Sequence, residues 1–136
     1  MQVGSDTATP LGPALQRAFE RFWHSVCTRH ELQAVDARAL AVTLLGRRLA
    51  VADLPGAGLV ALDDRCPHRS ASLSCGRAES DGLRCAYHGW RFGAGGRCNE
   101  IPSMPDGPIP QRAAVTSYDV AEAHGLVWVR LRRCQR

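Results

Sequence analysis

Two short motifs in this sequence pair a thiol with an imidazole. Cys66 and His68 are separated by one residue, Cys85 and His88 by two, and sixteen residues lie between the motifs. Thiolates and imidazoles are the side chains that bind soft and borderline metals. Each motif also lies in a segment rich in turn-forming residues. The pattern therefore predicts a metal site formed by two loops.

Two kinds of metal centre use two Cys and two His ligands. Structural zinc is tetrahedral, but its sites usually open with two cysteines two to four residues apart, so a Cys-x-His opening is atypical. In a Rieske 2Fe-2S centre, two Cys hold one iron and two His hold the other. Each loop then supplies one ligand to each iron, which explains why Cys alternates with His twice. The residues favour the iron-sulfur centre and leave zinc open.

The bulk composition is that of one folded domain. The chain has 136 residues, 45% of them hydrophobic and 22% charged, which is too short for a core plus a large second catalytic domain. No apolar run approaches the roughly 20 residues that span a bilayer, and the N-terminus does not resemble a secretory signal. We therefore expect a cytoplasmic protein without membrane association, whose six cysteines are reduced and available to metal.

The basic residues are all arginine, and the net charge is +4. They are spread along the chain without the clustering and interleaved aromatics of a nucleic-acid-binding surface, so we expect no nucleic-acid partner. The exception is the C-terminus, which we interpret as a solvated tail or a docking patch for an acidic partner. Its basic residues are Arg130, Arg132, Arg133 and Arg136.

The elements that must position the motifs are one helix and a series of short strands. The helix is predicted by apolar residues that recur every three or four positions after Pro13. These are Leu15, Ala18, Phe19, Phe22 and Val26. From about residue 38 the pattern changes to a predicted meander with one buried face, formed by "LAVTLLG", "RRLAVAD" and "GLVALDD".

Further strands follow the second motif. A hairpin is predicted to turn at Gly93 to Gly96, and two strands near 113–122 and 124–131 follow it. Strands this short and regular predict an all-β fold, an antiparallel β-sandwich or small barrel, with the motifs at turns outside its core. The proline-rich segment 101–110 is interpreted as a stiff surface connection or as a lid over the metal site.

The chain resembles the Rieske family, in particular the N-terminal Rieske domain of aromatic-ring-hydroxylating (Rieske non-haem iron) oxygenases. The similarity runs from about Phe22 to Leu131 and is carried by "LLGRRLAVAD", "CPHRSASLSCG", "LRCAYHGWRF", "GGRCNEIP" and "HGLVWVRL". It implies a Rieske-type sandwich with a cluster-binding subdomain of two loops, about 64–76 and 83–93. Residues 1–30 would form an N-terminal helical segment and 31–136 the Rieske domain.

The resemblance also implies the cofactor and the residues that surround it. One 2Fe-2S cluster would be bound by Cys66, His68, Cys85 and His88. The residues implied to line these ligands are Pro67, Arg69, Tyr87, Gly89 and Trp90, of which Tyr87 and Trp90 would keep water off the cluster. Ser70 stands where a Gly is common and Ala86 where a Pro is common, departures that would adjust the loop backbone.

Respiratory Rieske proteins carry an extra Cys in each loop, where this chain has Ala71 and Tyr87. The polar donors found there after the second His are also missing, since Trp90 follows Gly89. Fewer hydrogen bonds to the cluster imply a potential near the lower end of the Rieske range, roughly −150 mV. The resemblance therefore implies a reductase or ferredoxin as electron donor.

The resembling oxygenases hold a mononuclear iron with two His and one carboxylate in a second domain. Glu20, His24, His30 and His124 do not show the family's spacing, so we expect no complete catalytic iron site here. The implied function is to pass single electrons to such an oxygenase site, on a partner or a missing domain. The alternatives are a free-standing Rieske-type ferredoxin and a zinc-stabilised or redox-sensing module.

The cysteines outside the motifs receive simpler interpretations. Cys27, Cys98 and Cys134 are expected to be buried or incidental thiols. Cys75 follows the first motif closely and is a candidate neighbour of the metal site.

Overall fold

The structure is a computed structural model that describes residues 11–68 and 70–132. Within these ranges the helices are α1 (Pro13–Phe19), α2 (Arg29–Ala34) and a single 3-10 turn, η1 (Leu73–Cys75). The strands are β1 (His24–Thr28), β2 (Ala39–Leu44), β3 (Arg47–Leu54), β4 (Gly58–Asp63), β5 (Arg77–Glu79), β6 (Gly82–Arg84), β7 (Arg91–Phe92), β8 (Cys98–Glu100), β9 (Ser117–Ala123) and β10 (Leu126–Arg130).

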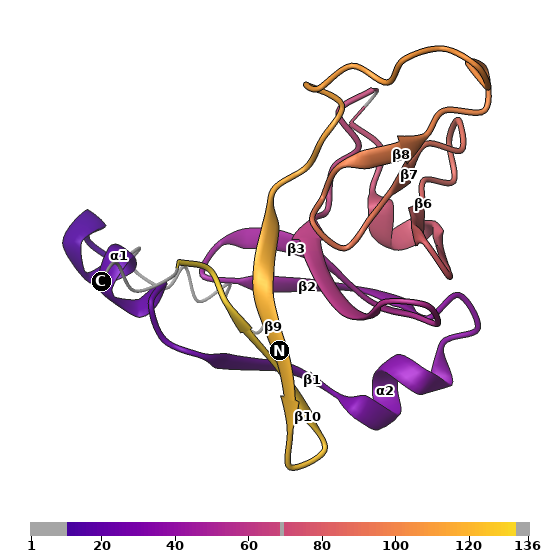
Figure 1. Cartoon of the computed structure of the whole chain (residues 1–136). Coiled ribbons are helices and arrows are strands. Elements are labelled where there is room, and N and C mark those ends of the chain that lie inside the picture. Colours follow the sequence, from indigo (N-terminus) through magenta and orange to yellow (C-terminus); the bar gives the residue numbers. More distant parts are fainter. Residues whose placement is uncertain (1–10, 69, 133–136) are drawn as a thin grey trace, which may run out of the picture.

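These strands form two antiparallel sheets. One has six strands in the order β1-β10-β9-β4-β3-β2, and the other has four in the order β5-β6-β7-β8. The smaller sheet is formed by the chain between β4 and β9 and lies at the upper right of Figure 1. The edge strands β1 and β2 contact each other, so the larger sheet is nearly closed. The predicted all-β antiparallel fold is confirmed.

Tight two-residue turns set the register of two hairpins in the larger sheet. Leu45 and Gly46 join β2 to β3 with φ values of 51° and 78°, and His124 and Gly125 join β9 to β10 with 56° and 74°. Positive φ at both central residues matches the right-handed twist of the flanking strands. The sequence predicted both hairpins because a glycine marks each turn.

Two groups of buried side chains lie on opposite faces of β3. Ala50 and Ala52 pack in one group with Phe92 of the smaller sheet, whereas Leu49 and Val51 pack in the other group with residues of β10. All four of these β3 residues are fully buried. The predicted meander with one buried face is therefore wrong for β3, because the smaller sheet covers the face that would otherwise be solvated.

The N-terminal helix is shorter than predicted. It ends at Phe19, and the residues from His24 to Thr28 form β1, which pairs with β10. Val26 was assigned to the helix from its spacing, but it is β-branched and suited to a strand. Pairing with β10 also satisfies the backbone polar groups of this segment. Phe22 belongs to neither element and is 61% exposed.

The helix α2 was not predicted. Its first turn carries a capping box: the Glu31 N–H donates to Thr28 Oγ1, and the Glu31 carboxylate accepts from the Thr28 N–H, both at 3.0 Å. Leu32 is fully buried against the larger sheet. The Thr-x-x-Glu spacing was visible in the sequence, but a six-residue helix is too short to show a periodic apolar pattern.

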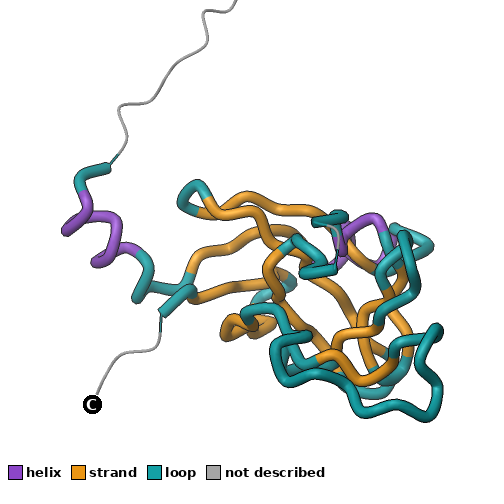
Figure 2. The backbone as a smooth tube through the Cα atoms, turned by 90° about the horizontal axis from the view of Figure 1, so that it is seen from above, coloured by secondary structure: helices purple, strands orange, loops and turns teal. Residues whose placement is uncertain are grey.

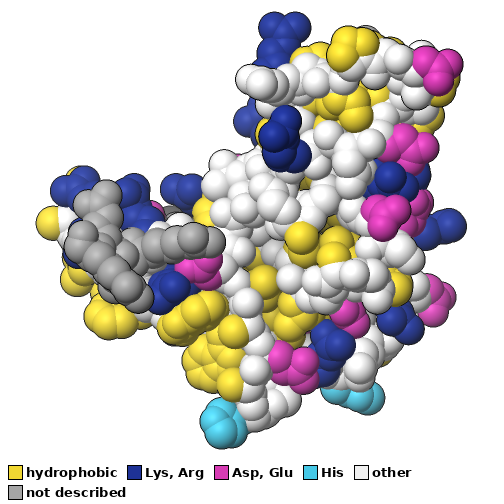
Figure 3. All heavy atoms as spheres, in the orientation of Figure 1, with side chains coloured by type: hydrophobic (Ala, Val, Ile, Leu, Met, Phe, Trp, Pro, Cys, Tyr) yellow, Lys and Arg dark blue, Asp and Glu magenta, His cyan; other side chains and the backbone are white. Residues whose placement is uncertain are grey.

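The helix α1 lies at one side of the strands (Figure 2), and Gln16 Nε2 donates to the carbonyl of Leu45 in the β2–β3 turn at 2.8 Å. Its side chains Leu15 and Phe19 are exposed. In the part of the chain that the structure describes, no helix is long and apolar enough to cross a membrane. Charged side chains of both signs lie next to one another at the right of the space-filling view, over the smaller sheet (Figure 3).

Candidate metal centre

The first ligand loop follows β4 and is closed by two backbone hydrogen bonds. The Cys66 N–H donates to the carbonyl of Ala71 and the Ser70 N–H donates to the carbonyl of Cys66, both at 2.7 Å. Ser70 has a φ of 57°, which is the left-handed conformation that favours glycine. Arg65 Nε donates to Ser70 Oγ at 3.0 Å and helps to hold this residue in place.

The second ligand loop joins β6 to β7 and repeats the same arrangement. The Cys85 N–H donates to the carbonyl of Trp90 at 2.8 Å, and the Gly89 N–H donates to the carbonyl of Cys85 at 3.1 Å. Gly89 has a φ of 77°. In both loops the cysteine is thus bonded to the residues four and five positions later, and the fourth is left-handed. Ser70 therefore occupies the position equivalent to Gly89.

The two loops bury their thiols and expose their imidazoles. Cys66 and Cys85 are each 2% exposed and belong to the core group between the two sheets. His68 and His88 are exposed, and their ring centroids lie 4.9 Å apart. The expectation that the motifs lie outside the core is therefore wrong for the cysteines. The smaller sheet adds a second layer, so the base of each loop becomes interior.

Aromatic rings flank both imidazoles. Trp90 is stacked on His68 with centroids 4.6 Å apart and an interplanar angle of 13°. Tyr87 meets His88 edge-on at 4.1 Å, but it is 58% exposed. Trp90 is half-buried.

The proline-rich segment 101–110 lies against the second loop. An added side chain at Gly89 would meet the ring of Pro102 at 3.1 Å. A hollow of about 260 Å³ is lined by Pro67, Trp90, Pro110, Arg112 and Ala113. Pro67 is exposed at this hollow, and Arg69 lies outside the described residues.

The donor set distinguishes a cluster from a single ion. Among the residues that the structure describes, no three His, Cys, Asp or Glu side chains converge on one point as ligands of a single metal ion. Tetrahedral zinc would need four such ligands, whereas each iron of a Rieske centre takes only two from the protein. Two buried thiols with two adjacent exposed imidazoles therefore fit the 2Fe-2S group better than zinc.

Asp64 holds the base of the first loop and was missed in the sequence. Its carboxylate accepts hydrogen bonds from Arg48 Nε at 2.8 Å, from the Ser74 N–H at 2.6 Å and from Ser74 Oγ at 2.7 Å. The Asp64 side chain is fully buried while that of Arg48 is 60% exposed. The carboxylate thus ties the end of β4 to η1 across the loop.

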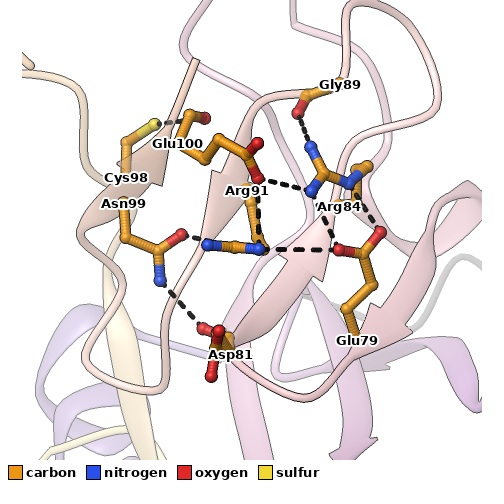
Figure 4. A network of polar contacts seen from close by, with 8 residues as sticks. All are labelled: Glu79, Asp81, Arg84, Gly89, Arg91, Cys98, Asn99 and Glu100. Atoms are coloured by element: carbon orange, nitrogen blue, oxygen red, sulfur yellow. Dashed lines mark hydrogen bonds and ion pairs between the residues drawn. The ribbon is translucent and has the colours of Figure 1, made fainter. Parts of the chain in front are cut away.

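Arg84 immediately precedes Cys85 of the second loop, and it was also missed. Its guanidinium binds the carboxylates of Glu79 and Glu100 and the carbonyl of Gly89 (Figure 4). Arg91 binds the same two carboxylates. This network joins all four strands of the smaller sheet, from which the second loop projects.

The remaining histidines and their acidic neighbour have local roles. Glu20 is buried and forms an ion pair with Arg132, and His24 Nε2 lies 2.8 Å from the carbonyl of Phe19. His30 on α2 and His124 in the β9–β10 turn are exposed, and their neighbours Arg29 and Gly125 are joined by a backbone hydrogen bond of 2.8 Å.

Three of the four cysteines outside the motifs lie within the described residues. Cys27 is half-buried and Cys98 is buried, and burial is the main cause that raises the pKa of both thiols. Cys75 is exposed and lines a hollow of about 600 Å³ together with Cys85 and Gly89. Cys134, Arg133 and Arg136 lie outside the described residues.

With this geometry, comparison with known proteins defines the class. Residues 22–119 match the family model of the Rieske [2Fe-2S] domain. The chain belongs to this family, and its cofactor is a 2Fe-2S cluster. Its homologues are the N-terminal Rieske domains of Rieske oxygenases.

The individual relatives are oxygenase components and an oxidoreductase. The chain is 46% identical to methylxanthine N1-demethylase NdmA of Pseudomonas putida over 113 residues, 81% of this chain and 32% of the relative. It is 38% identical to the 3-chlorobenzoate-3,4-dioxygenase oxygenase subunit of Comamonas testosteroni over 122 residues, 89% of this chain and 27% of the relative. It is 34% identical to oxidoreductase NdmD of P. putida over 110 residues, 80% of this chain and 18% of the relative.

A solved structure of P. putida NdmA superimposes with a TM-score of 0.81 at 43% identity, covering 86% of this chain and 36% of that one. The chain therefore spans about a third of the length of NdmA.

Proposed function

We propose that this domain binds its 2Fe-2S cluster through Cys66 and Cys85 on one iron and His68 and His88 on the other. When bound, the cluster supplies reversible one-electron transfer. The buried cysteines hold the inner side of the site, in a region that excludes water. The exposed imidazoles keep their outer nitrogens within reach of a partner.

The proposed role is to take single electrons from a reductase or ferredoxin and deliver them to a mononuclear non-haem iron oxygenase site. The donor is oxidised by one electron, and the acceptor iron is reduced by one. The names of the relatives support this assignment, since they include both oxygenase components and an oxidoreductase. The acceptor would lie on a partner chain or on a further domain. We propose the cytoplasm as the compartment, because the ligands must be reduced thiols.

One observation carries the proposal: the paired loops, each closed by the same hydrogen bonds, bring the imidazole centroids to 4.9 Å at the surface. Electron transfer benefits from an exposed edge of the centre, whereas a structural zinc site only needs its four coordination positions filled by protein ligands. The same edge allows a partner carboxylate to accept a hydrogen bond from an imidazole.

A redox titration tests the direction of electron flow. We expect a midpoint potential in the lower part of the Rieske range, near roughly −150 mV, and reduction of the cluster by a flavin reductase supplied with NADH. A potential near the upper limit of that range, roughly +300 mV, would instead indicate a donor such as a quinol. Reduction followed by reoxidation with several unrelated oxygenases would favour a free-standing carrier.

A further inference from the structure

Arg84 is the residue immediately before Cys85, and every nitrogen of its guanidinium has a partner. Nε donates to Glu79 Oε2 at 2.6 Å, and Nη2 donates to Glu79 Oε1 at 2.9 Å and to Glu100 Oε2 at 2.6 Å. The remaining nitrogen, Nη1, donates to the carbonyl of Gly89 at 2.6 Å. Figure 4 shows the guanidinium between the two carboxylates and the loop.

The two carboxylates fix the guanidinium in this orientation. Glu79 and Glu100 come from β5 and β8, the two edge strands of the smaller sheet. Their hydrogen bonds to Arg84 are the main cause that lowers the pKa of both carboxyl groups, so both remain charged near neutral pH. A bidentate pair with a planar guanidinium has a defined geometry, which an ammonium cannot reproduce.

The Gly89 carbonyl belongs to the peptide that joins Gly89 to Trp90. The Gly89 N–H is already bonded to Cys85, so the peptide groups on both sides of this residue are held. Its φ of 77° and the ring of Pro102 beside it leave little room for another arrangement. The bond from Arg84 therefore fixes the last part of the loop between His88 and Trp90.

Arg91 provides a comparison within the same network. Its Nη1 lies 3.1 Å from Glu100 Oε2 and 3.7 Å from Glu79 Oε1. Its Nε donates to Asn99 Oδ1 at 2.7 Å, a contact on the side away from the loop. Arg84 and Arg91 thus neutralise the same carboxylates. Of the two, Arg84 alone also bonds to the ligand loop, through the Gly89 carbonyl.

We propose that Arg84 is a positioning residue for the second ligand loop, which orients His88 through the Gly89 carbonyl and keeps a positive charge beside the cluster. The proposal rests on the proposed function, because it takes Cys85 and His88 as ligands. Loss of the guanidinium fork would remove the side-chain bond that holds the peptide between Gly89 and Trp90. Loss of the charge would leave Glu79 and Glu100 less compensated, which disfavours adding an electron nearby.

The experiment compares Arg84→Lys and Arg84→Gln with the matched controls Arg91→Lys and Arg91→Gln. Each variant is purified with its cluster, and three quantities are measured: the midpoint potential, the EPR g values of the reduced protein and the lifetime of the cluster in air. The far-ultraviolet circular dichroism spectrum reports the fold independently of the cluster.

We expect Arg84→Lys to change the g values and shorten the cluster lifetime roughly tenfold, the factor for one lost hydrogen bond to a charged group. Arg91→Lys should leave both unchanged. Arg84→Gln should also lower the equilibrium constant for reduction about tenfold, which is about 59 mV for one electron. This shift in midpoint potential should be larger than the shift caused by Arg91→Gln.

Three outcomes would overturn the proposal: g values and lifetime of Arg84→Lys equal to those of the parent protein, equal losses in Arg84→Lys and Arg91→Lys, or loss of the β-sheet spectrum in Arg84→Lys. The last would mean that Arg84 serves the sheet and not the loop. Failure of the proposed function is distinguishable, because the parent protein would then lack the Rieske signal before any substitution is made.

Discussion

Gly76 sets the spacing between the two ligand loops. It ends the segment that follows the first loop, and its N–H donates to the carbonyl of Leu73 at 2.9 Å. A Cβ at this position would lie 1.8 Å from the carbonyl oxygen of Arg84 and 2.9 Å from its carbonyl carbon. Real Cβ atoms essentially never approach other atoms closer than 3.0 Å. Gly76→Ala therefore requires a displacement of about 1.2 Å, the difference between 3.0 and 1.8 Å.

The displaced carbonyl belongs to the residue before Cys85, so the second loop must move away from the first. Backbone atoms on both sides make the contact, and no flexible side chain can absorb it. Overpacking of this kind costs about 1–3 kcal/mol and occasionally more, and we expect Gly76→Ala to reach at least about 3 kcal/mol. The cluster should be lost in parallel, because its ligands come from both loops.

The assay measures iron per chain and the thermal midpoint of Gly76→Ala against Gly95→Ala. Gly95 is exposed, and a Cβ there would meet no heavy atom within 4 Å, so this control should match the parent protein. A Gly76→Ala protein with full iron content and an unchanged thermal midpoint would refute the reasoning, since the loops could then separate without consequence.

Three further results are expected. Replacing His68 or His88 by Ala should abolish the rhombic EPR signal of the reduced cluster, because one iron loses a nitrogen ligand. Trp90→Ala should shorten the cluster lifetime in air several-fold, since a stacked ring pair contributes about 0.5–1.5 kcal/mol. The hydrogen bond from Arg132 is the main cause that lowers the pKa of Glu20, so Arg132→Gln should destabilise the fold at neutral pH by up to about 1 kcal/mol.

The sign of the last effect follows from the lowered pKa. The Glu20–Arg132 pair stabilises the fold fully above the ordinary carboxyl pKa, and this contribution is lost as the pH falls through the lowered value. The thermal midpoints of Arg132→Gln and the parent protein should therefore converge in acid. The expected destabilisation is small because the side chain of Arg132 is 54% exposed, so water screens the ion pair. A difference that persists unchanged at low pH would contradict this assignment.

Matched substitutions control the other two results. His124→Ala changes an exposed histidine in the β9–β10 turn and should retain the full signal. Trp90→Phe keeps a flat ring that can stack on His68 and should retain most of the cluster lifetime. A rhombic signal that survives in His68→Ala or His88→Ala would overturn the ligand assignment, and equal lifetimes for Trp90→Ala and Trp90→Phe would remove the shielding role.

Strands β2, β3, β4, β9 and β10 of the larger sheet and its glycine-marked turns could be predicted from the sequence, because alternation and turn glycines are local signals. The two motifs were also visible, since each pairs its residues within four positions. The burial of the cysteines was not, because it depends on the smaller sheet packing against β3. The same contact explains why both faces of β3 are buried.

The end of α1 and the residues that support the loops depend on distant parts of the chain. Residues 24–28 become a strand because β10, about a hundred residues later, provides its hydrogen bonds. Asp64 and Arg84 bind partners such as Arg48 and Glu100, each sixteen residues away. A charged residue beside a ligand motif resembles any surface charge until the sheet brings its partners together.

The most direct test of the central claim is an EPR spectrum of the dithionite-reduced protein, recorded with its iron and zinc content. Ligation by two cysteines and two histidines predicts a rhombic Rieske signal, about two irons per chain and no zinc. An EPR-silent protein with one zinc per chain would contradict the account, because the four side chains would then hold a single ion with no redox function.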